Sequence, residues 1–483
     1  MKKIIIVFIV AVLLFAAFNI FNISIYNYLD RDYDDLIAKD YNGVNIDEVD
    51  NYNIDIKFEP EQRLCKIEQT VDYINKENTD LNQVYFHLYP NAFRENIIGL
   101  GLVENVNPDY EPGYIEFSEI KIKGEVIDFE IIGADKTLLK IELDNILKPK
   151  ERLKIIMEYT LKIPNLEHRF GYYKSTFNFG NWYPIAAVYD QKGWNLSEYY
   201  VIGDPFYSDI GNYNISIEVP SNYIIAASGK ILSEEIFEDK KIWKIRARLM
   251  RDFAWVASED FTKRTHNLKD TQVKIYFLTD NKDLMNYTKN IARQAMQIYS
   301  KKFGKYPYGQ VSIVETNFLS GGMEYPGLVY IDTDKFIGSQ KTYLSEYIVH
   351  EIAHQWWYST VGNNQITDPW LDEGLATYSQ IVFSRETRGE AYAEGLYRSL
   401  MGIYNTSRSN RDMLTPVTEF TAWNDYSAVA YGKGAAFLHD LEQKYGTEDV
   451  EKILQEYYKR FKFKNAFSED FFKIVEEVVG AQY

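Results

Sequence analysis

The stretch that decides the fold is His350-Glu351-Ile352-Ala353-His354. On a helix, side chains four residues apart lie on the same face, so the two imidazoles can converge on one metal ion. Glu351 lies about a quarter-turn away and can reach a water molecule bound to that ion. Because the chain of 483 residues holds only six histidines, chance is a weak explanation for this spacing. The stretch therefore predicts a zinc site on a helix.

A catalytic zinc ion usually has three protein ligands and one open position, so a third ligand is required. We expect it to be Glu373 in Trp370-Leu371-Asp372-Glu373-Gly374-Leu375-Ala376, with 18 residues between it and His354. A turn at residues 361–364 allows the next helix to return beside the first. A carboxylate in the first turn of a helix is also an ordinary partner of the helix dipole, so the assignment depends on the spacing. We expect one Zn2+ per chain, held by His350, His354 and Glu373.

Composition excludes several classes of protein. The chain has 53 Lys or Arg residues against 70 Asp or Glu residues, which is a formal net charge of −17. This acidic excess argues against a nucleic-acid partner, because phosphate binding needs clustered basic residues. The single cysteine, Cys65, excludes both an intramolecular disulfide and a thiolate zinc site. Any metal must therefore be held by histidine and carboxylate side chains.

The N-terminus reads as an export segment. Lys2 and Lys3 precede an apolar run that extends from Ile4 to about Ile23, interrupted near its end by Asn19 and Asn22. That length approaches the roughly 20 residues that span a bilayer, and no small-residue cleavage pattern follows it. We expect residues 1–26 to be a single-pass membrane anchor with the catalytic domain outside the cytoplasm, and residues 27–50 to be an acidic tether. A cleaved signal and a secreted protein are the alternative.

Two domains are expected after the tether. Residues 51–262 show the period of two that is typical of half-exposed strands, as in Leu153, Ile155, Met157, Tyr159 and Leu161. This pattern predicts a mostly antiparallel β saddle or sandwich. In residues 263–483, a strand is expected near 273–277, then a helix at about 282–303, then strands near 311–314 and 328–331. Helices dominate the rest of the chain. They are expected at about 343–358, from 369 onwards, and at about 428–445, 448–461 and 469–479. The predicted fold class is α+β with several domains.

Two further motifs accompany the metal motif, and together they resemble a known family. Gly321-Gly322-Met323-Glu324-Tyr325 is similar to the motif G-x-M-E-N, and Tyr431-Gly432-Lys433-Gly434-Ala435 is similar to Y-x-K-G. With the two histidines, the 18-residue spacing and the W-L-x-E-G segment, these motifs resemble the zinc aminopeptidases of the aminopeptidase N and leukotriene hydrolase type, which are gluzincin metallopeptidases. The resemblance covers roughly residues 52–483. It implies a β saddle followed by a thermolysin-like, mainly helical catalytic domain.

The resemblance also implies a role for each matching residue. His350, His354 and Glu373 would bind zinc, and Glu351 would be the general base. Glu324 would bind the free α-amine of the substrate, in a loop where Gly321, Gly322 and Met323 also contact the substrate. Tyr431 would donate a hydrogen bond to the oxyanion, which is a role that suits a neutral phenol.

The chain departs from the family pattern at several points. Asp372 replaces the asparagine before the third ligand, and Tyr325 replaces the asparagine that ends G-x-M-E-N. The region around residues 181–184 lacks the glutamine that many members place near the first substrate pocket. The family's preference for a particular N-terminal substrate side chain is therefore not carried over to this chain. The sequence ends at Tyr483, so we expect a short form that lacks the C-terminal helical domain of many relatives. Its cleft should be more open, with closure by a partner, or a sequence that has been cut short, as the alternatives.

The expected activity is removal of N-terminal residues from peptides that have a free N-terminus. Three alternatives remain open from the sequence. A zinc endopeptidase has no need of Glu324, an epoxide hydrolase of the leukotriene type acts on a lipid, and a noncatalytic binding module loses a ligand or the base. The presence of His350, Glu351, His354 and Glu373 speaks against the last of these.

Overall fold

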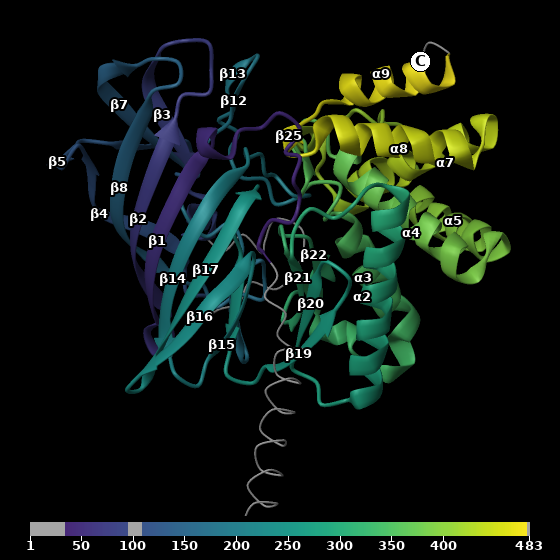
Figure 1. Ribbon diagram of the computed structural model, residues 1–483, viewed down its shortest axis with the longest axis horizontal. Coiled ribbons are helices and arrows are strands. Elements are labelled where there is room, and N and C mark those ends of the chain that lie inside the picture. The colour runs from purple at the N-terminus through teal and green to yellow at the C-terminus, as the bar shows by residue number, and fades with distance from the viewer. Residues whose placement is uncertain (1–33, 95–108, 481–483) are drawn as a thin grey trace, which may run out of the picture.

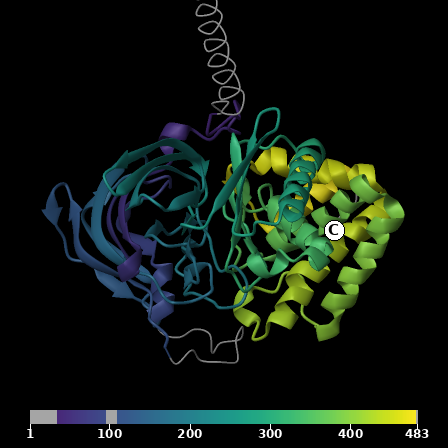
Figure 2. The same ribbon diagram turned by 90° about the horizontal axis from the view of Figure 1, so that it is seen from below.

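The computed structural model describes residues 34–94 and 109–480. The expected membrane anchor, residues 1–26, lies outside the described residues. Within the described ranges, none of the helices is both long enough and apolar enough to cross a membrane. Figure 1 shows two parts side by side, a β-rich part formed by the first half of the chain and a part in which helices surround a smaller sheet. The second view shows the same division (Figure 2).

A large sheet forms the outer wall of the β-rich part. Its order is β16-β17-β14-β1-β2-β8-β4-β5, and every neighbouring pair is antiparallel except β1 with β14. The strands are β1 (Asp50–Glu59), β2 (Leu64–Ile74), β4 (Tyr114–Ile122), β5 (Glu125–Val126), β8 (Arg152–Lys162), β14 (Gly211–Pro220), β16 (Lys230–Phe237) and β17 (Lys240–Met250).

Two four-stranded sheets complete the β-rich part. One has the order β15-β18-β10-β9, and the other β11-β3-β7-β6. Alternate residues of β1, among them Ile54, Ile56 and Phe58, are buried, which is the period expected of a strand with one covered face. Phe58 contacts the rings of Phe177 and Trp255, so the first small sheet packs on the inner face of the large one. The strands are β3 (Leu81–His87), β6 (Glu130–Ile132), β7 (Leu138–Leu147), β9 (Phe170–Tyr173), β10 (Thr176–Phe179), β11 (Ile185–Ala186), β15 (Ile224–Ala227) and β18 (Trp255–Ser258), with a short pair β12 (Tyr189–Asp190) and β13 (Gly193–Trp194) beside them.

The second part contains a five-stranded sheet in the order β19-β20-β21-β23-β22, followed by helices. Its strands are β19 (Thr262–Asn267), β20 (Gln272–Phe277), β21 (Gln310–Thr316), β22 (Gly322–Met323) and β23 (Leu328–Asp332). Its helices are α2 (Lys282–Lys302), α3 (Lys341–Ala353), α4 (Trp370–Arg388), α5 (Glu390–Tyr404), α6 (Trp423–Ser427), a π-helix (Ala428–Lys433), α7 (Gly434–Tyr445), α8 (Thr447–Phe461) and α9 (Ser468–Val479). The predicted α+β class, a β-rich part followed by a mainly helical part, is confirmed.

Several predicted boundaries differ from the structure. The helix expected to run to residue 358 ends at Ala353, and the hydroxyl of Thr360 donates to the carbonyl of Gln355 in the turn that follows. The helix expected from residue 369 is divided into α4 and α5 at Gly389. Its φ of 87° is a backbone conformation that glycine adopts readily and that interrupts the helix. The helix expected at 428–445 begins as the π-helix.

Residues 34–50 do not behave as a free tether. Asp35 is 1% exposed and pairs with Arg246 and Arg248 of β17, while the buried Leu36 forms a bridge with Tyr308. Burial opposes ionisation, but hydrogen bonds from Arg248 and Arg246 lower the pKa of Asp35 to about 2. At least one of the acidic residues of this segment therefore holds it against β17 through ion pairs.

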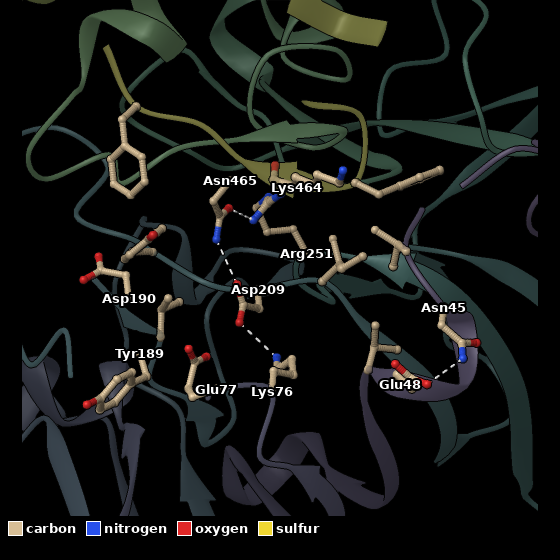
Figure 3. A pocket seen from close by; sticks show the side chains of 17 residues that line it. Asn45, Glu48, Lys76, Glu77, Tyr189, Asp190, Asp209, Arg251, Lys464 and Asn465 are labelled. Atoms are coloured by element: carbon tan, nitrogen blue, oxygen red, sulfur yellow. Dashed lines mark hydrogen bonds and ion pairs between the residues drawn. The ribbon is translucent and has the colours of Figure 1, made fainter. Parts of the chain in front are cut away.

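The two parts meet along a seam that is held by Arg251. This side chain is 1% exposed, and its Nε donates to the carbonyl oxygen of Tyr358, 2.9 Å away, in the turn after α3. It also donates to Asn465 in β25 (Lys464–Asn465), which pairs with β24 (Val361–Gly362). Asn465 donates to Asp209, which accepts in turn from Lys76 (Figure 3). These contacts line a pocket of about 390 Å³, and they fix the turn after α3 against the β-rich part.

Candidate active site

Two helices bring three metal-binding atoms together. His350 and His354 lie at the end of α3, and Glu373 lies in the first turn of α4. The Nε2 atoms of the two histidines are 3.2 Å apart, and Oε2 of Glu373 is 3.2 Å from the first and 3.4 Å from the second. Ligands about 2.0 Å from a tetrahedral ion lie roughly 3.3 Å from one another. The three donors therefore fit a zinc ion.

The charge of the site also fits a cation. Glu324, Glu351, Asp372 and Glu373 are all buried, and in the described part of the chain none of them forms an ion pair with a lysine or an arginine. The Arg169 guanidinium is close but pairs with Asp204 at 2.7 Å. Burying four carboxylates with only two imidazoles paired to them is costly. A divalent ion would offset that cost.

Asp372 orients one of the histidines. Its Oδ1 lies 2.5 Å from Nδ1 of His354, so Nδ1 carries the proton and Nε2 presents its lone pair to the metal position. Burial disfavours a charged imidazole, but Asp372 and Glu324 outweigh it and raise the pKa of His354, so a metal ion would have to displace a proton from Nε2. In the sequence, Asp372 stands out only as a departure from the family pattern. Its position next to Glu373 is the one sequence feature that could have indicated its contact with His354.

Glu351 is buried beside the glycine-rich loop. A Cβ atom on Gly322 would lie only 2.2 Å from Oε1 of Glu351, so the glycine makes room for this carboxylate. Gly321 has a φ of 90°, and a side chain there would meet the ring of Tyr347. Burial raises the pKa of Glu351 well above its usual range.

Glu324 lies close to these groups. It follows the edge strand β22, is 3% exposed, and offers an oxygen within 4.8 Å of donor atoms of Glu351 and His354. Gln355, which follows His354, holds the loop by donating to the carbonyl of Tyr325 and accepting from the amide of Gly327. Burial, followed by the nearby Asp204, raises the pKa of Glu324.

Tyr325 ties this loop to the β-rich part. Its ring is buried, and its hydroxyl donates to Oδ1 of Asn181, 2.7 Å away. Asn181 donates in turn to Asp252. A Cβ on Gly180 would overlap the tyrosine hydroxyl, so the β-rich part has a space for this side chain. The tyrosine that replaces the family's asparagine is thus matched by its surroundings.

Tyr431 lies in the π-helix and reaches the metal ligands. Its hydroxyl donates to Oε1 of Glu373 at 2.5 Å, and its ring stacks on His350 with centroids 5.7 Å apart. The π-helix and α7 approach α4 closely, because a Cβ on Gly374 would lie 2.7 Å from the Cα of Gly434. A π-helical turn of this kind is often found at functional sites. In the structure, the Tyr431 hydroxyl is therefore bonded to Glu373, one of the three candidate metal donors, rather than standing free.

The predicted site residues are therefore brought together. His350, His354 and Glu373 converge, and Glu351 and Glu324 lie beside them. Gly322 and the buried Met323 form the adjoining edge strand of the sheet, and Gly321 directly precedes it. Two further groups have no signal in the sequence: the buried amide of Gln365 and the Arg169–Asp204 pair.

Comparison with known sequences gives a consistent picture. Residues 287–482 match the family model described as Peptidase family M1 domain. Endoplasmic reticulum aminopeptidase 2 of Homo sapiens is 27% identical over 327 residues, which are 62% of this chain and 33% of that protein. Aminopeptidase 2 of Candida albicans is 22% identical over 389 residues, 76% of this chain and 41% of that protein. The chain spans less than half the length of these curated relatives.

Solved structures share the fold. The M1 zinc metallopeptidase from Deinococcus radiodurans superposes with a TM-score of 0.63 at 16% identity, over 90% of this chain and 91% of that one. A mutant of the same enzyme, solved with a Tyr-Ser-Ala substrate bound, superposes equally well. Both the β-rich part and the helical part therefore have counterparts in one known architecture.

Proposed function

We propose, for a chain whose residues 287–482 form a domain of peptidase family M1, that it is a zinc aminopeptidase that hydrolyses N-terminal residues from peptides. The names of its relatives support this proposal. The substrate would be a peptide with a free N-terminus, and one Zn2+ per chain would be bound by His350, His354 and Glu373.

One observation carries the specificity for a free N-terminus. Glu324 is 3% exposed beside the metal donors and has no ion-pair partner in the described residues. A buried carboxylate without a counter-ion is costly unless a cation arrives. The α-ammonium of a peptide is such a cation, and its capture by Glu324 would place the first peptide bond over the metal position.

The other residues have separate tasks. Bound zinc would polarise the scissile carbonyl and lower the pKa of the attacking water. Glu351 can accept the proton of that water and return it to the leaving amine. Tyr431 can donate to the developing negative charge on the carbonyl oxygen, for which its hydroxyl must exchange its bond to Glu373.

The alternatives differ in what they need from the site. An endopeptidase gains nothing from Glu324, since its substrates present no ammonium there. An epoxide hydrolase of the leukotriene type would use the same metal donors on a lipid. A noncatalytic module does not need the complete set of donors and base that the structure assembles.

The test is a panel of unblocked aminoacyl reporters and their N-acetylated counterparts, assayed with and without a chelator. We expect cleavage of the unblocked reporters, and its loss on metal removal. Cleavage of blocked and unblocked reporters at equal rates would contradict the aminopeptidase proposal and favour the endopeptidase.

Attachment to a membrane through the apolar run from Ile4 to Ile23 is a further part of the proposal, supported by the sequence pattern alone. The catalytic domain would then lie outside the cytoplasm. Cell fractionation and sequencing of the mature N-terminus test it. Soluble protein that begins near residues 20–30 would show a cleaved signal instead.

A further inference from the structure

We propose that Gln365 is a positioning residue that holds the amine-binding Glu324 and the histidine-orienting Asp372 in their working places. The inference rests on the proposed function, because it assigns amine binding to Glu324. It concerns a residue that no motif includes, in the segment between β24 and α4.

The side chain of Gln365 bridges the two carboxylates. It is 2% exposed, and its Nε2 donates to Oδ2 of Asp372 and, at 3.4 Å, to Oε1 of Glu324. Its backbone amide donates to the carbonyl of Phe206, 3.2 Å away in the β-rich part. The position of Gln365 is therefore set from outside the catalytic helices.

The chemistry of the amide explains the choice of residue. An amide nitrogen carries two hydrogens, one for each carboxylate, and the group adds no charge. Turning the amide over would place its oxygen against two carboxylates, so the orientation is determined by its partners. Glu324 and Asp372 repel each other electrostatically, and a neutral donor between them opposes that repulsion.

A second observation points towards the substrate. The Oε1 atom of Gln365 is buried without a hydrogen-bond partner in the described residues. Unpaired buried oxygens are unusual and call for an explanation. An α-ammonium bound at Glu324 brings three N–H donors beside this amide, and one of them can pair with the oxygen.

Gln365→Leu removes the donors and keeps most of the volume. We expect the preference for free over acetylated peptides to fall about tenfold to a hundredfold, mostly through KM, because hydrogen bonds to charged groups are lost. We also expect faster loss of zinc to a chelator, because Asp372 is released. Gln365→Glu keeps the shape but adds a like charge, and should reduce the preference at least as much.

Gln380→Leu is the matched control. Gln380 is a buried glutamine of α4 whose Nε2 donates to the carbonyl of Glu346, away from both carboxylates. Its replacement should leave the preference and the zinc loss unchanged. In a Glu324→Ala background, Gln365→Leu should have little further effect on the preference.

The outcomes separate the inference from the proposed function. If the unmutated enzyme cleaves acetylated and free peptides equally, the proposed function and the amine-binding role both fail. If the unmutated enzyme discriminates, and Gln365→Leu and Gln365→Glu retain its full discrimination and zinc retention, the inference alone is overturned.

Discussion

Asp372 lies against His354, with its Oδ1 2.5 Å from Nδ1 of the imidazole, on the side opposite to the metal position. Nε2 of the same ring faces His350 and Glu373. The carboxylate therefore favours the tautomer and the ring orientation in which Nε2 of His354 faces the other two candidate metal donors.

The first prediction concerns this contact. Asp372→Ala should weaken zinc binding about tenfold to a hundredfold, which is the typical loss when the partner of a metal-bound histidine is removed. Asp372→Asn keeps an acceptor for the Nδ1 proton and should lose less. Chelator competition followed by metal analysis measures both variants. Equal zinc retention by Asp372→Ala and the unmutated protein would contradict the orienting role.

The second prediction separates metal binding from catalysis. Glu351→Gln should keep the zinc ion and lose turnover, because Glu351 acts on the attacking water and the ligands are left intact. Metal analysis of the purified variant and a reporter assay decide it. A variant that retains zinc and full activity would remove Glu351 as the base.

The third prediction concerns the close approach of α4 and α7. In Gly374→Ala, the new Cβ would lie 2.7 Å from the Cα of Gly434, so the helices must separate and Tyr431 must move from Glu373. We expect both a lower thermal midpoint and a lower kcat. Gly395→Ala on α5 is the control, because its Cβ meets no atom within 4 Å, and it should stabilise by about 0.5–1 kcal/mol. Unchanged stability and kcat in Gly374→Ala would show that the contact is not critical.

The fourth prediction is a dependence of stability on pH. The pKa of Asp35 is lowered to about 2 in the folded protein, so its ion pairs contribute fully above the unfolded pKa of about 4. The contribution is lost as the pH falls from about 4 to 2. Because the pairs are partly exposed and screened, Asp35→Asn should cost about 1–2 kcal/mol at pH 7. Denaturant unfolding at several pH values tests whether this difference shrinks on acidification. A difference that is constant from pH 7 to the acid limit would contradict the assignment.

How much of the site the sequence can predict depends on how local its geometry is. His350 and His354 are predictable because a spacing of four residues on a helix determines their convergence. Gln365 is not, because its place depends on a loop that is fixed by a backbone contact to Phe206 in the other part of the chain. The π-helix around Tyr431 is also beyond the pattern, since its extra residue per turn leaves no mark in hydrophobic periodicity.

The same distinction holds for the fold. Alternation along β1 predicts a strand with one buried face, and the structure shows it. The end of α3 depends instead on the turn around Tyr358, whose φ of 108° is held by contacts that include Arg251. The sequence does not predict this end of the helix, because the apolar pattern typical of a helix continues through Trp356 and Trp357.

The last prediction tests the specificity itself. Glu324→Gln keeps the shape of the side chain but removes the charge that pairs with an α-ammonium. Because Glu324 is buried and forms no ion pair within the described residues, its charge should be worth about one to two orders of magnitude in kcat/KM for free peptides. Cleavage of acetylated peptides, which bring no charge, should change far less, so the ratio of the two rates should collapse towards one. Parallel assays on matched free and acetylated peptides, with zinc content measured in each preparation, give the ratio. An undiminished ratio in Glu324→Gln would mean that another group captures the amine.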